Sequence, residues 1–363
     1  MRILSCLLSN VPIVSNTSSI FQRILMHFPD GGNMSLAFAY GSGVFAQKGH
    51  KNPTANMLDF IFAVQDPLKW HSENLSLNQN HYSLLMQKLG AERIAQLQEN
   101  YGANIFYNTL IICEGRIIKY GIISNEKLES DLLNWDNLYV AGRLHKPVNI
   151  IRHRFENNPK LMLAMRRNYH SALYASFLML PEVFSEWQLY HTIAGLSYLG
   201  DFRMKFGEDK NKVSNIVEPN YTRFQDLYHP ILESIAADCR EFVSWNVKSA
   251  VVEVDSSPKA RHVYLDKLPL RVQIRMAREF DRNAIQIRDT EEILRNIARY
   301  ANIEDPVRDA LIYTVKRSSW SQSRKSLIGV GPVKGWKYAS QKLDKMWKGM
   351  KNSKKLTETV GDT

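Results

Sequence analysis

The residues best suited to chemistry lie near the N-terminus, around a Gly-Ser-Gly turn at 41–43. Apolar, β-prone runs flank the turn at 36–40 and 57–64, and Asp59 stands inside the second run. Backbone N–H groups of a glycine-rich turn can face phosphate oxygens. An acid inside an apolar strand is costly to bury unless it is paired or binds a metal. The stretch therefore predicts either an ordinary turn beside a paired acid, or a site for phosphate and a metal ion.

This stretch resembles the nucleotidyltransferase signature, in which a Gly-Ser turn holds a nucleoside triphosphate and a nearby strand carboxylate holds Mg²⁺. The resemblance assigns nucleotide binding to Tyr40, Gly41, Ser42 and Gly43, and metal binding to Asp59. It implies Mg²⁺ as the cofactor.

The second acid of that signature is missing from its usual place. The wider pattern has two acids alternating on one strand face, whereas the residues two positions from Asp59 are Met57 and Ile61. A two-metal site would therefore need a carboxylate from another segment. We expect Asp201 to supply it, with Glu208 as the second choice.

Charge is unevenly distributed along the chain. The 363 residues carry a net charge of +11, but from Lys316 onwards twelve Lys and Arg face three acids, which leaves the preceding chain at +2. Proteins that bind nucleic acid usually carry their charge across a folded face. A basic tail on a nearly neutral body therefore disfavours nucleic acid as a partner.

Length and composition bound the class of protein. A chain of 363 residues suits two modest domains, and no apolar run reaches the ~20 residues that a membrane-spanning helix needs. The three cysteines, Cys6, Cys113 and Cys239, are far apart and form no metal-ligand spacing. This usage fits a reducing compartment, and any work at a membrane would take place on its surface.

The N-terminal residues 1–18 are compatible with a mitochondrial presequence, because arginine and serine occur there and no acid precedes Asp30. A secretory signal is the competing interpretation, since residues 3–8 are largely apolar. That run is short and is broken by Asn10 and Pro12, so we favour the presequence.

Apolar spacing predicts the secondary structure. Helices are expected at 19–27, 91–100, 131–143 (closed by Gly142), 161–180, 186–198 and through most of 267–317, with a break at Pro306. Two β-prone runs, 105–113 and 116–123, surround Glu114-Gly115 and predict a hairpin that contains Lys119. A second, charged hairpin is expected between Gly200 and Val217.

The C-terminal tail contains an amphipathic segment. Apolar residues recur at helical spacing on one face, namely Trp336, Ala339, Leu343, Met346, Trp347 and Met350. Lysines lie mostly off that face, and tryptophan beside a lysine-rich face is typical of an interfacial membrane helix. We expect Trp336, Leu343, Met346 and Trp347 to bind an anionic membrane surface. The alternative is a helix docked on the protein body.

Thirteen segments together identify a resemblance to the mitochondrial translocator assembly and maintenance family, the mitochondrial CDP-diacylglycerol synthases (phosphatidate cytidylyltransferases). They are 40–44 (YGSGV), 57–60 (MLDF), 66–67 (DP), 70–71 (WH), 81–83 (HYS), 100–103 (NYGA), 119–121 (KYG), 132–135 (LLNW), 141–144 (AGRL), 193–198 (IAGLSY), 200–204 (GDFRM), 207–210 (GEDK) and 346–348 (MWK). The resemblance covers nearly the whole chain.

The resemblance implies an α+β fold. A nucleotidyltransferase domain with a mixed sheet is expected at 19–155, a helical, winged-helix-like domain at 156–315 and a basic tail with the membrane helix at 316–363. It implies CTP and phosphatidic acid as substrates, CDP-diacylglycerol for cardiolipin synthesis as the product, and a peripheral place on the matrix side of the inner mitochondrial membrane. The oligomeric state stays open, a homo-oligomer included.

The implied reaction requires residues that neutralise the negative charge of the substrates, and it does not require a strong base. A phosphate oxygen of phosphatidic acid is already anionic near neutral pH, so the site must hold two anions in line. We expect Asp59, Lys119, Asp201 and Arg203 to be catalytic, with Asp59 and Asp201 as metal ligands. The ordinary alternative for Asp201 and Arg203 is an ion pair across a hairpin turn.

Four further residues are weaker candidates for contact with the nucleotide or its phosphates. His71 and His81 could contact nucleotide, but exposed structural histidines are the default expectation. Lys48 and Lys51 touch either phosphate or solvent.

Two other functions compete. A nucleotidyltransferase acting on RNA would need basic faces with exposed aromatics around the core, which a near-neutral body does not favour. A non-catalytic import-assembly factor would have no need of Asp59 or the Gly-Ser turn.

Overall fold

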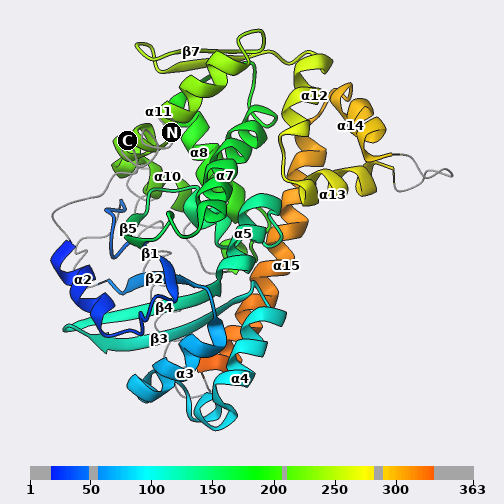
Figure 1. Ribbon diagram of the computed structural model, residues 1–363. Coiled ribbons are helices and arrows are strands. Elements are labelled where there is room, and N and C mark those ends of the chain that lie inside the picture. Colours follow the sequence, from blue (N-terminus) through cyan, green and yellow to red (C-terminus); the bar gives the residue numbers. More distant parts are fainter. Residues whose placement is uncertain (1–17, 49–55, 207–210, 282–288, 331–363) are drawn as a thin grey trace, which may run out of the picture.

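The computed structural model describes residues 18–48, 56–206, 211–281 and 289–330. Figure 1 shows a twisted sheet with helices on both faces and a mostly helical second region above it. This architecture confirms the predicted α+β class with a mixed sheet and a helical C-terminal region. The predicted presequence and the predicted membrane helix both lie outside the described residues.

The sheet has five strands in the order β3-β4-β2-β1-β5. The strands are β1 (Met34–Tyr40), β2 (Leu58–Val64), β3 (Ile105–Cys113), β4 (Arg116–Ser124) and β5 (Asn149–His153). β2 and β4 run parallel, whereas the other neighbouring pairs are antiparallel. The sheet is therefore mixed, and its centre is the parallel pair that carries Asp59 and Lys119.

Both faces of the sheet are buried, which explains why its strands read as almost continuous apolar runs. Alternate residues of β1 and β2 enter two different cores. On one face lie α2 (Ser18–Met26), α3 (Pro67–Leu77) and α4 (Leu84–Asn100). The other face packs on α5 (Asn125–Asn134) and α7 (Pro159–Phe177).

The second region continues the larger of these two cores. Its helices are α8 (Glu186–Gly195), α11 (Tyr221–Asp238), α12 (Pro258–Asp266), α13 (Leu270–Phe280) and α14 (Thr290–Ala298). A small antiparallel sheet, in the order β6-β8-β7, joins β6 (Val183–Ser185), β7 (Val243–Asn246) and β8 (Val251–Val254). One apolar core thus runs from the main sheet into the helical region.

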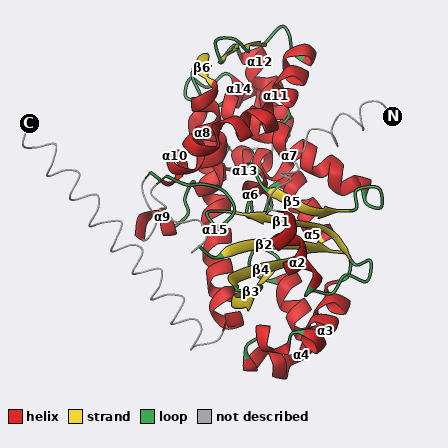
Figure 2. Cartoon of the chain, turned by 90° about the vertical axis from the view of Figure 1, so that its left-hand side faces the viewer, coloured by secondary structure: helices red, strands yellow, loops and turns green. Residues whose placement is uncertain are grey.

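The last described helix, α15 (Glu304–Val330), ties the two regions together. It starts beside α13 and runs down to β3 and α4 (Figures 1 and 2). Near its end the Gln322 side chain accepts from the Ala103 N–H (3.0 Å) and donates to the Ile105 carbonyl oxygen (3.2 Å). Buried Lys325 donates to backbone carbonyl oxygens at the end of α4, including that of Gln98 at 3.3 Å. The predicted boundary at 315/316 therefore falls inside one helix.

None of the helices in the described residues is long and apolar enough to cross a membrane.

The hairpin expected between Gly200 and Val217 is wrong. The described part of this segment forms α9 (Arg203–Phe206) and α10 (Lys212–Val217). The Asp201 carboxylate accepts from the Arg203 backbone N–H at 3.0 Å, which forms an Asx turn at the start of α9.

The single helix expected over 131–143 is also wrong. α5 ends at Asn134, Trp135 adopts a left-handed conformation (φ 53°), and α6 (Ala141–Leu144) starts after an irregular loop. Asp131 is the physical reason. Its buried carboxylate accepts four backbone N–H groups, those of Asn137, Leu138, Val140 and Ala141, at 2.8–3.0 Å.

The break expected at Pro306 is wrong as well: Pro306 lies in the first turn of α15, where proline is tolerated, and the helices are interrupted at 299–303 instead. The remaining element predictions agree with the structure. The first hairpin forms between β3 and β4, with Glu114 (φ 50°) and Gly115 (φ 70°) at its turn. Two positive φ angles at the turn are typical of a two-residue hairpin. The helices expected at 19–27 and 161–180 correspond to α2 and α7.

Candidate active site

A cavity of about 230 Å³ opens between the end of the main sheet and the helical region. Its floor is the turn after β1 with the facing parts of β2 and β4. Its other walls come from α6, from η3 (Leu196–Tyr198) and the residues after it, from α10 and from the middle of α15. Five cationic side chains line it, namely Lys119, Arg143, Lys146, Arg203 and Lys212, against two acids, Asp59 and Asp201.

Strand register brings the predicted floor residues together. Tyr40 pairs with Asp59 across β1 and β2, and Asp59 pairs with Lys119 across β2 and β4. The Lys119 Nζ lies 3.3 Å from Asp59 Oδ1 and 4.3 Å from the centre of the Tyr107 ring. The sequence prediction that these side chains share one site is therefore met, and their roles stay predictions.

Two glycines of the turn are required by its geometry. Gly41 has a φ of +83°, a conformation that side chains rarely adopt, and a Cβ there would lie 3.5 Å from Asp59 Oδ2. A Cβ on Gly43 would overlap the Met57 carbonyl oxygen. The turn is also closed by donation from the Val44 and Phe45 N–H groups to the Gly41 carbonyl oxygen, each at 3.0 Å.

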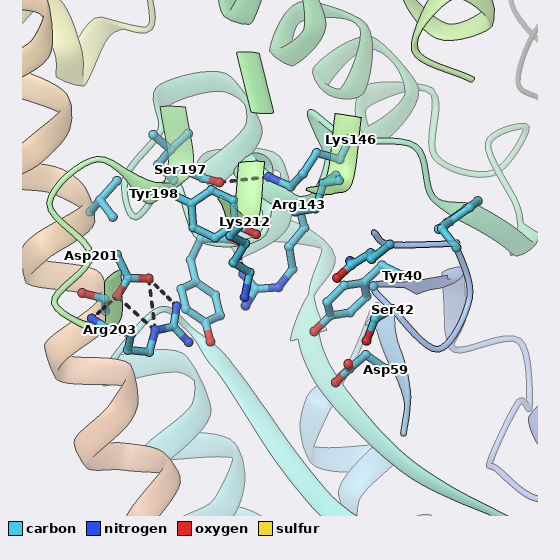
Figure 3. Close-up of a pocket in the computed structure, with 18 of the residues that line it drawn as sticks. Tyr40, Ser42, Asp59, Arg143, Lys146, Ser197, Tyr198, Asp201, Arg203 and Lys212 are labelled. Atoms are coloured by element: carbon cyan, nitrogen blue, oxygen red, sulfur yellow. Dashed lines mark hydrogen bonds and ion pairs between the residues drawn. The ribbon is translucent and has the colours of Figure 1, made fainter. Parts of the chain in front are cut away.

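Ser42→Ala should weaken use of the nucleotide without unfolding the protein. The hydroxyl lies in the cavity wall beside Asp59 (Figure 3), and its loss removes one polar contact, on the order of 1–3 kcal/mol of transition-state binding. Initial rates at limiting CTP measure the effect. Ser76→Ala, at an exposed position of α3, is the control. An unchanged rate would leave the turn with a structural role alone.

A second group of side chains surrounds Lys146, which follows α6. Its Nζ donates to the Gly142 carbonyl oxygen and to Ser197 Oγ (3.0 Å), and it lies 5.0 Å from the centre of the Tyr198 ring. Lys212 lies 5.7 Å from the same ring. Burial, together with repulsion from Arg143 and Lys212, lowers the pKa of Lys146 to about 7.

Arg143 lies between the floor and the Lys146 group (Figure 3). Its guanidinium carbon is 3.9 Å from the Tyr139 ring centre and 5.4 Å from that of Tyr40. Burial opposes ionisation of Tyr139, but Arg143, Arg203 and Lys119 outweigh it and lower its pKa to about 8. The cations around Tyr139 therefore favour its ionised form despite burial.

Asp201 and Arg203 form the third side of the cavity (Figure 3). Arg203 Nε lies 3.0 and 3.1 Å from the two oxygens of the buried Asp201 carboxylate, and Nη2 adds a further bond at 2.5 Å. Burial alone would raise the pKa of Asp201, but Arg203 outweighs it and holds the pKa below its usual value. The expected ion pair exists, although it spans a helix start and not a hairpin turn. These contacts favour a positioning role for Asp201, while its metal-ligand role stays a prediction.

Asp201→Asn tests the two roles against each other. If Asp201 positions Arg203, activity should fall and stay low when Mg²⁺ is raised or Mn²⁺ is supplied, because the guanidinium has lost a buried partner. The measurement is the metal dependence of turnover per folded molecule. Recovery with Mn²⁺ would restore the metal-ligand assignment.

The remaining predicted residues lie elsewhere or outside the described residues. His71 is fully buried rather than exposed, and it bonds Tyr82 Oη and Gln98 Oε1, each at 2.9 Å. Burial lowers its pKa to about 4, so it is a neutral structural side chain. His81 bonds Tyr120 Oη at 2.9 Å, and Lys48 forms an exposed pair with Glu218 at 3.0 Å. Lys51 and Glu208 are outside the described residues.

Sequence reasoning missed several cavity residues. They are Tyr139, Arg143, Lys146, Ser197, Tyr198 and Lys212. The signal available was their place within or next to three of the thirteen segments, at 141–144, 193–198 and 207–210. No periodicity marks them, because they meet only through the packing of α6, η3 and α10.

The floor fits a magnesium ion held partly by substrate. Mg²⁺ is usually bound through one or two carboxylates together with substrate phosphates. Asp59 is a half-buried carboxylate whose Oδ2 faces the Gly41 turn. In the part of the chain that the structure describes, no cluster of three or more His, Cys, Asp or Glu side chains is suited to hold a metal by itself.

The glycine turn, the strand carboxylate and the five cations define a site for phosphate-bearing substrates. Comparison with known proteins identifies the family within this broad class of phosphate-binding proteins. The family described as mitochondrial phosphatidate cytidylyltransferase matches residues 21–345.

Curated relatives carry the same description. The Xenopus laevis mitochondrial phosphatidate cytidylyltransferase is 46% identical over 347 residues, which cover 95% of this chain and 99% of that protein. The Bos taurus protein is 48% identical over 330 residues (91% and 95%), and the Drosophila melanogaster protein is 38% identical over 347 (90% and 98%). The chain belongs to the mitochondrial phosphatidate cytidylyltransferase family, which confirms the resemblance stated from the sequence.

Proposed function

We propose that this protein transfers the cytidylyl group of CTP to phosphatidic acid in the cavity between the sheet and the helical region, forming CDP-diacylglycerol and pyrophosphate. The family gives the activity, that of a mitochondrial phosphatidate cytidylyltransferase, a nucleotidyltransferase. The observation that supports this location is the meeting of the Gly41 turn, Asp59 and Lys119 with four further cations in one cavity.

The reaction exchanges one phosphorus–oxygen bond for another. A phosphate oxygen of phosphatidic acid bonds to the α-phosphorus of CTP, and the bond from that phosphorus to the bridging oxygen of the β-phosphate breaks. Pyrophosphate leaves with the electron pair. The attacking oxygen is already an anion, so no residue has to remove a proton from it. The protein's main tasks are to position the two substrates and to neutralise their negative charge.

The floor of the cavity would hold the triphosphate. The turn at Gly41 and Ser42 would bind its phosphates, and Asp59 would hold Mg²⁺ together with them. The ion would supply Lewis-acid stabilisation of the developing charge. Lys119 both orients Asp59, at 3.3 Å, and brings a positive charge to the same place. Arg203, held by Asp201, would neutralise charge from the third side.

Purified protein offered phosphatidic acid, Mg²⁺ and each of the four ribonucleoside triphosphates separately tests this function. Liponucleotide should form with CTP and fall sharply with ATP, GTP and UTP. Absence of any lipid product would contradict the proposal. Incorporation of nucleotide into RNA would favour the RNA alternative instead, and full activity of Asp59→Asn in supporting import assembly would favour a non-catalytic factor.

The names of the relatives place the family in the mitochondrion. We propose that the protein is peripheral on the matrix side of the inner membrane and that Trp336, Leu343, Met346 and Trp347 attach it to anionic lipid. These residues lie outside the described part of the chain, which ends at Val330, the last residue of α15. We further propose a nucleotidyltransferase domain followed by a winged-helix-like domain, in keeping with the sheet and the helical region, with the boundary between them near residue 155.

Removal of residues 334–363 should release the protein from anionic liposomes. The lysines of this segment each contribute about 1 kcal/mol near an anionic leaflet, and the attraction is screened as salt rises. Sedimentation with liposomes measures binding, and short-chain, water-soluble phosphatidate is the control substrate on which turnover should survive. Equal sedimentation of the intact and shortened proteins would contradict the assignment.

A further inference from the structure

Two cations of the cavity, Arg143 and Lys146, have no carboxylate partner among the described residues. The two acids among the described cavity residues lie against other partners, since Asp59 pairs with Lys119 and Asp201 with Arg203. The polar contacts of Lys146 are a carbonyl oxygen and the Ser197 hydroxyl, and Arg143 lies among tyrosine rings. No carboxylate contacts either cation within the described part of the chain.

Two buried polar atoms beside them also lack well-formed hydrogen bonds. The Nε of Arg143 and the hydroxyl of Tyr40 are inaccessible to solvent and make no hydrogen bond of good geometry with a described residue, although the guanidinium and the phenol interact with each other. A buried polar group without a well-formed hydrogen bond destabilises the folded state. Burial, together with repulsion from Arg143 and Lys212, lowers the pKa of Lys146 to about 7. An anion bound here would offset both costs.

We infer that Lys146, Arg143 and Ser197, with Lys212 beside them, bind the phosphomonoester of the lipid acceptor, so that the cavity has a separate acceptor subsite opposite the triphosphate subsite. This inference rests on the proposed function. Arg143, which lies between the two subsites, then contacts both substrates, and the Ser197 hydroxyl donates to the acceptor phosphate.

The in-line geometry of the reaction explains why this end takes the acceptor and not the triphosphate. Attacking and leaving oxygens lie on opposite sides of the α-phosphorus in such transfers. In the proposed function the leaving pyrophosphate is bound by the Gly41 turn and Asp59. The attacking phosphate must therefore approach the α-phosphorus from the opposite side. Figure 3 shows Lys146, Ser197 and Tyr198 on that other side, across Arg143 from Ser42 and Asp59. Ile216, one helical turn from Lys212 on α10, adds an apolar surface where the glycerol end of a lipid would lie.

Lys146→Gln is the variant that tests the subsite, with Lys146→Arg as the conservative partner. The substrate is dihexanoyl phosphatidate, which is soluble and therefore separates phosphate recognition from binding to a bilayer. In Lys146→Gln we expect its KM and its equilibrium Kd to rise at least about tenfold, while the Kd of CTP changes less than about twofold. Lys146→Arg should recover most of the loss, since it keeps the charge.

A matched control is Lys48→Gln, which removes an exposed, salt-bridged lysine and should leave all three constants unchanged. Thermal unfolding of each variant identifies a fold defect, and Lys212→Gln repeats the test if Lys146→Gln does not fold. A tenfold rise in the Kd of CTP with an unchanged KM for lipid would overturn the inference and assign these cations to the triphosphate. Unchanged constants for both substrates would overturn it as well.

Failure of the proposed function would look different. Wild-type protein would then bind CTP yet form no CDP-diacylglycerol, whereas direct binding of dihexanoyl phosphatidate, measured by calorimetry, would still report whether the subsite exists.

Discussion

Asp59→Asn should lower turnover at least about a hundredfold while the protein stays folded, a loss of ~2.7 kcal/mol in transition-state stabilisation. The substitution is nearly isosteric, but it removes the charge that would hold Mg²⁺ and that pairs with Lys119 at 3.3 Å. Steady-state formation of CDP-diacylglycerol measures the effect, and circular dichroism reports the fold.

Asp66→Asn is the matched control for that variant. Asp66 follows the opposite end of the same strand, β2, where its carboxylate caps α3 by accepting from the Lys69 N–H at 3.0 Å. Asparagine caps helices about as well as aspartate, so activity should be close to that of wild type. If Asp59→Asn kept more than about a tenth of wild-type activity, a loss below ~1.4 kcal/mol, Asp59 would not be the principal metal ligand.

The second large effect is expected at Asp131, which is not among the residues that line the cavity. Asp131→Asn should lower the free energy of unfolding by about 2–4 kcal/mol, because one acceptor oxygen becomes an NH₂ group that faces two buried backbone N–H groups. One of the two pairs of N–H groups, that of Val140 and Ala141, starts α6, which carries Arg143. Urea unfolding measures the loss. In the folded variant, without denaturant, the KM for phosphatidate should also rise, because α6 positions Arg143.

Asp136→Asn provides the comparison within the same loop. Asp136 is partly exposed and pairs with the exposed Arg271 at 3.1 Å, so its loss should cost less than about 1 kcal/mol. Equal unfolding midpoints for the Asp131 and Asp136 variants would show that the four backbone hydrogen bonds of Asp131 do not hold the loop.

The floor of the cavity was predictable from the sequence because it depends on local pattern. Two apolar runs around a glycine turn imply adjacent strands, and an acid and a lysine inside such strands must find polar surroundings. The structure adds the register, which places Asp59 beside both Tyr40 and Lys119.

The upper walls were not predictable because they depend on side chains that override local propensity. Asp131 breaks a segment with a continuous helical pattern by taking four backbone N–H groups. Asp201 starts a helix where charged residues around Gly207 resemble a hairpin turn. Lys146 and Lys212 approach one tyrosine ring only after η3 and α10 pack together. No spacing of residues in the sequence predicts that these two lysines lie close together.

Transfer of oxygen-18 tests the central claim most directly. Phosphatidic acid labelled with oxygen-18 in its phosphate is incubated with CTP, Mg²⁺ and the purified protein. Mass spectrometry then measures the oxygen-18 content of CDP-diacylglycerol and of pyrophosphate. Attack of the lipid phosphate on the α-phosphorus of CTP predicts that CDP-diacylglycerol retains all of the label and that pyrophosphate contains none. Absence of CDP-diacylglycerol, or appearance of oxygen-18 in the released pyrophosphate, would contradict it.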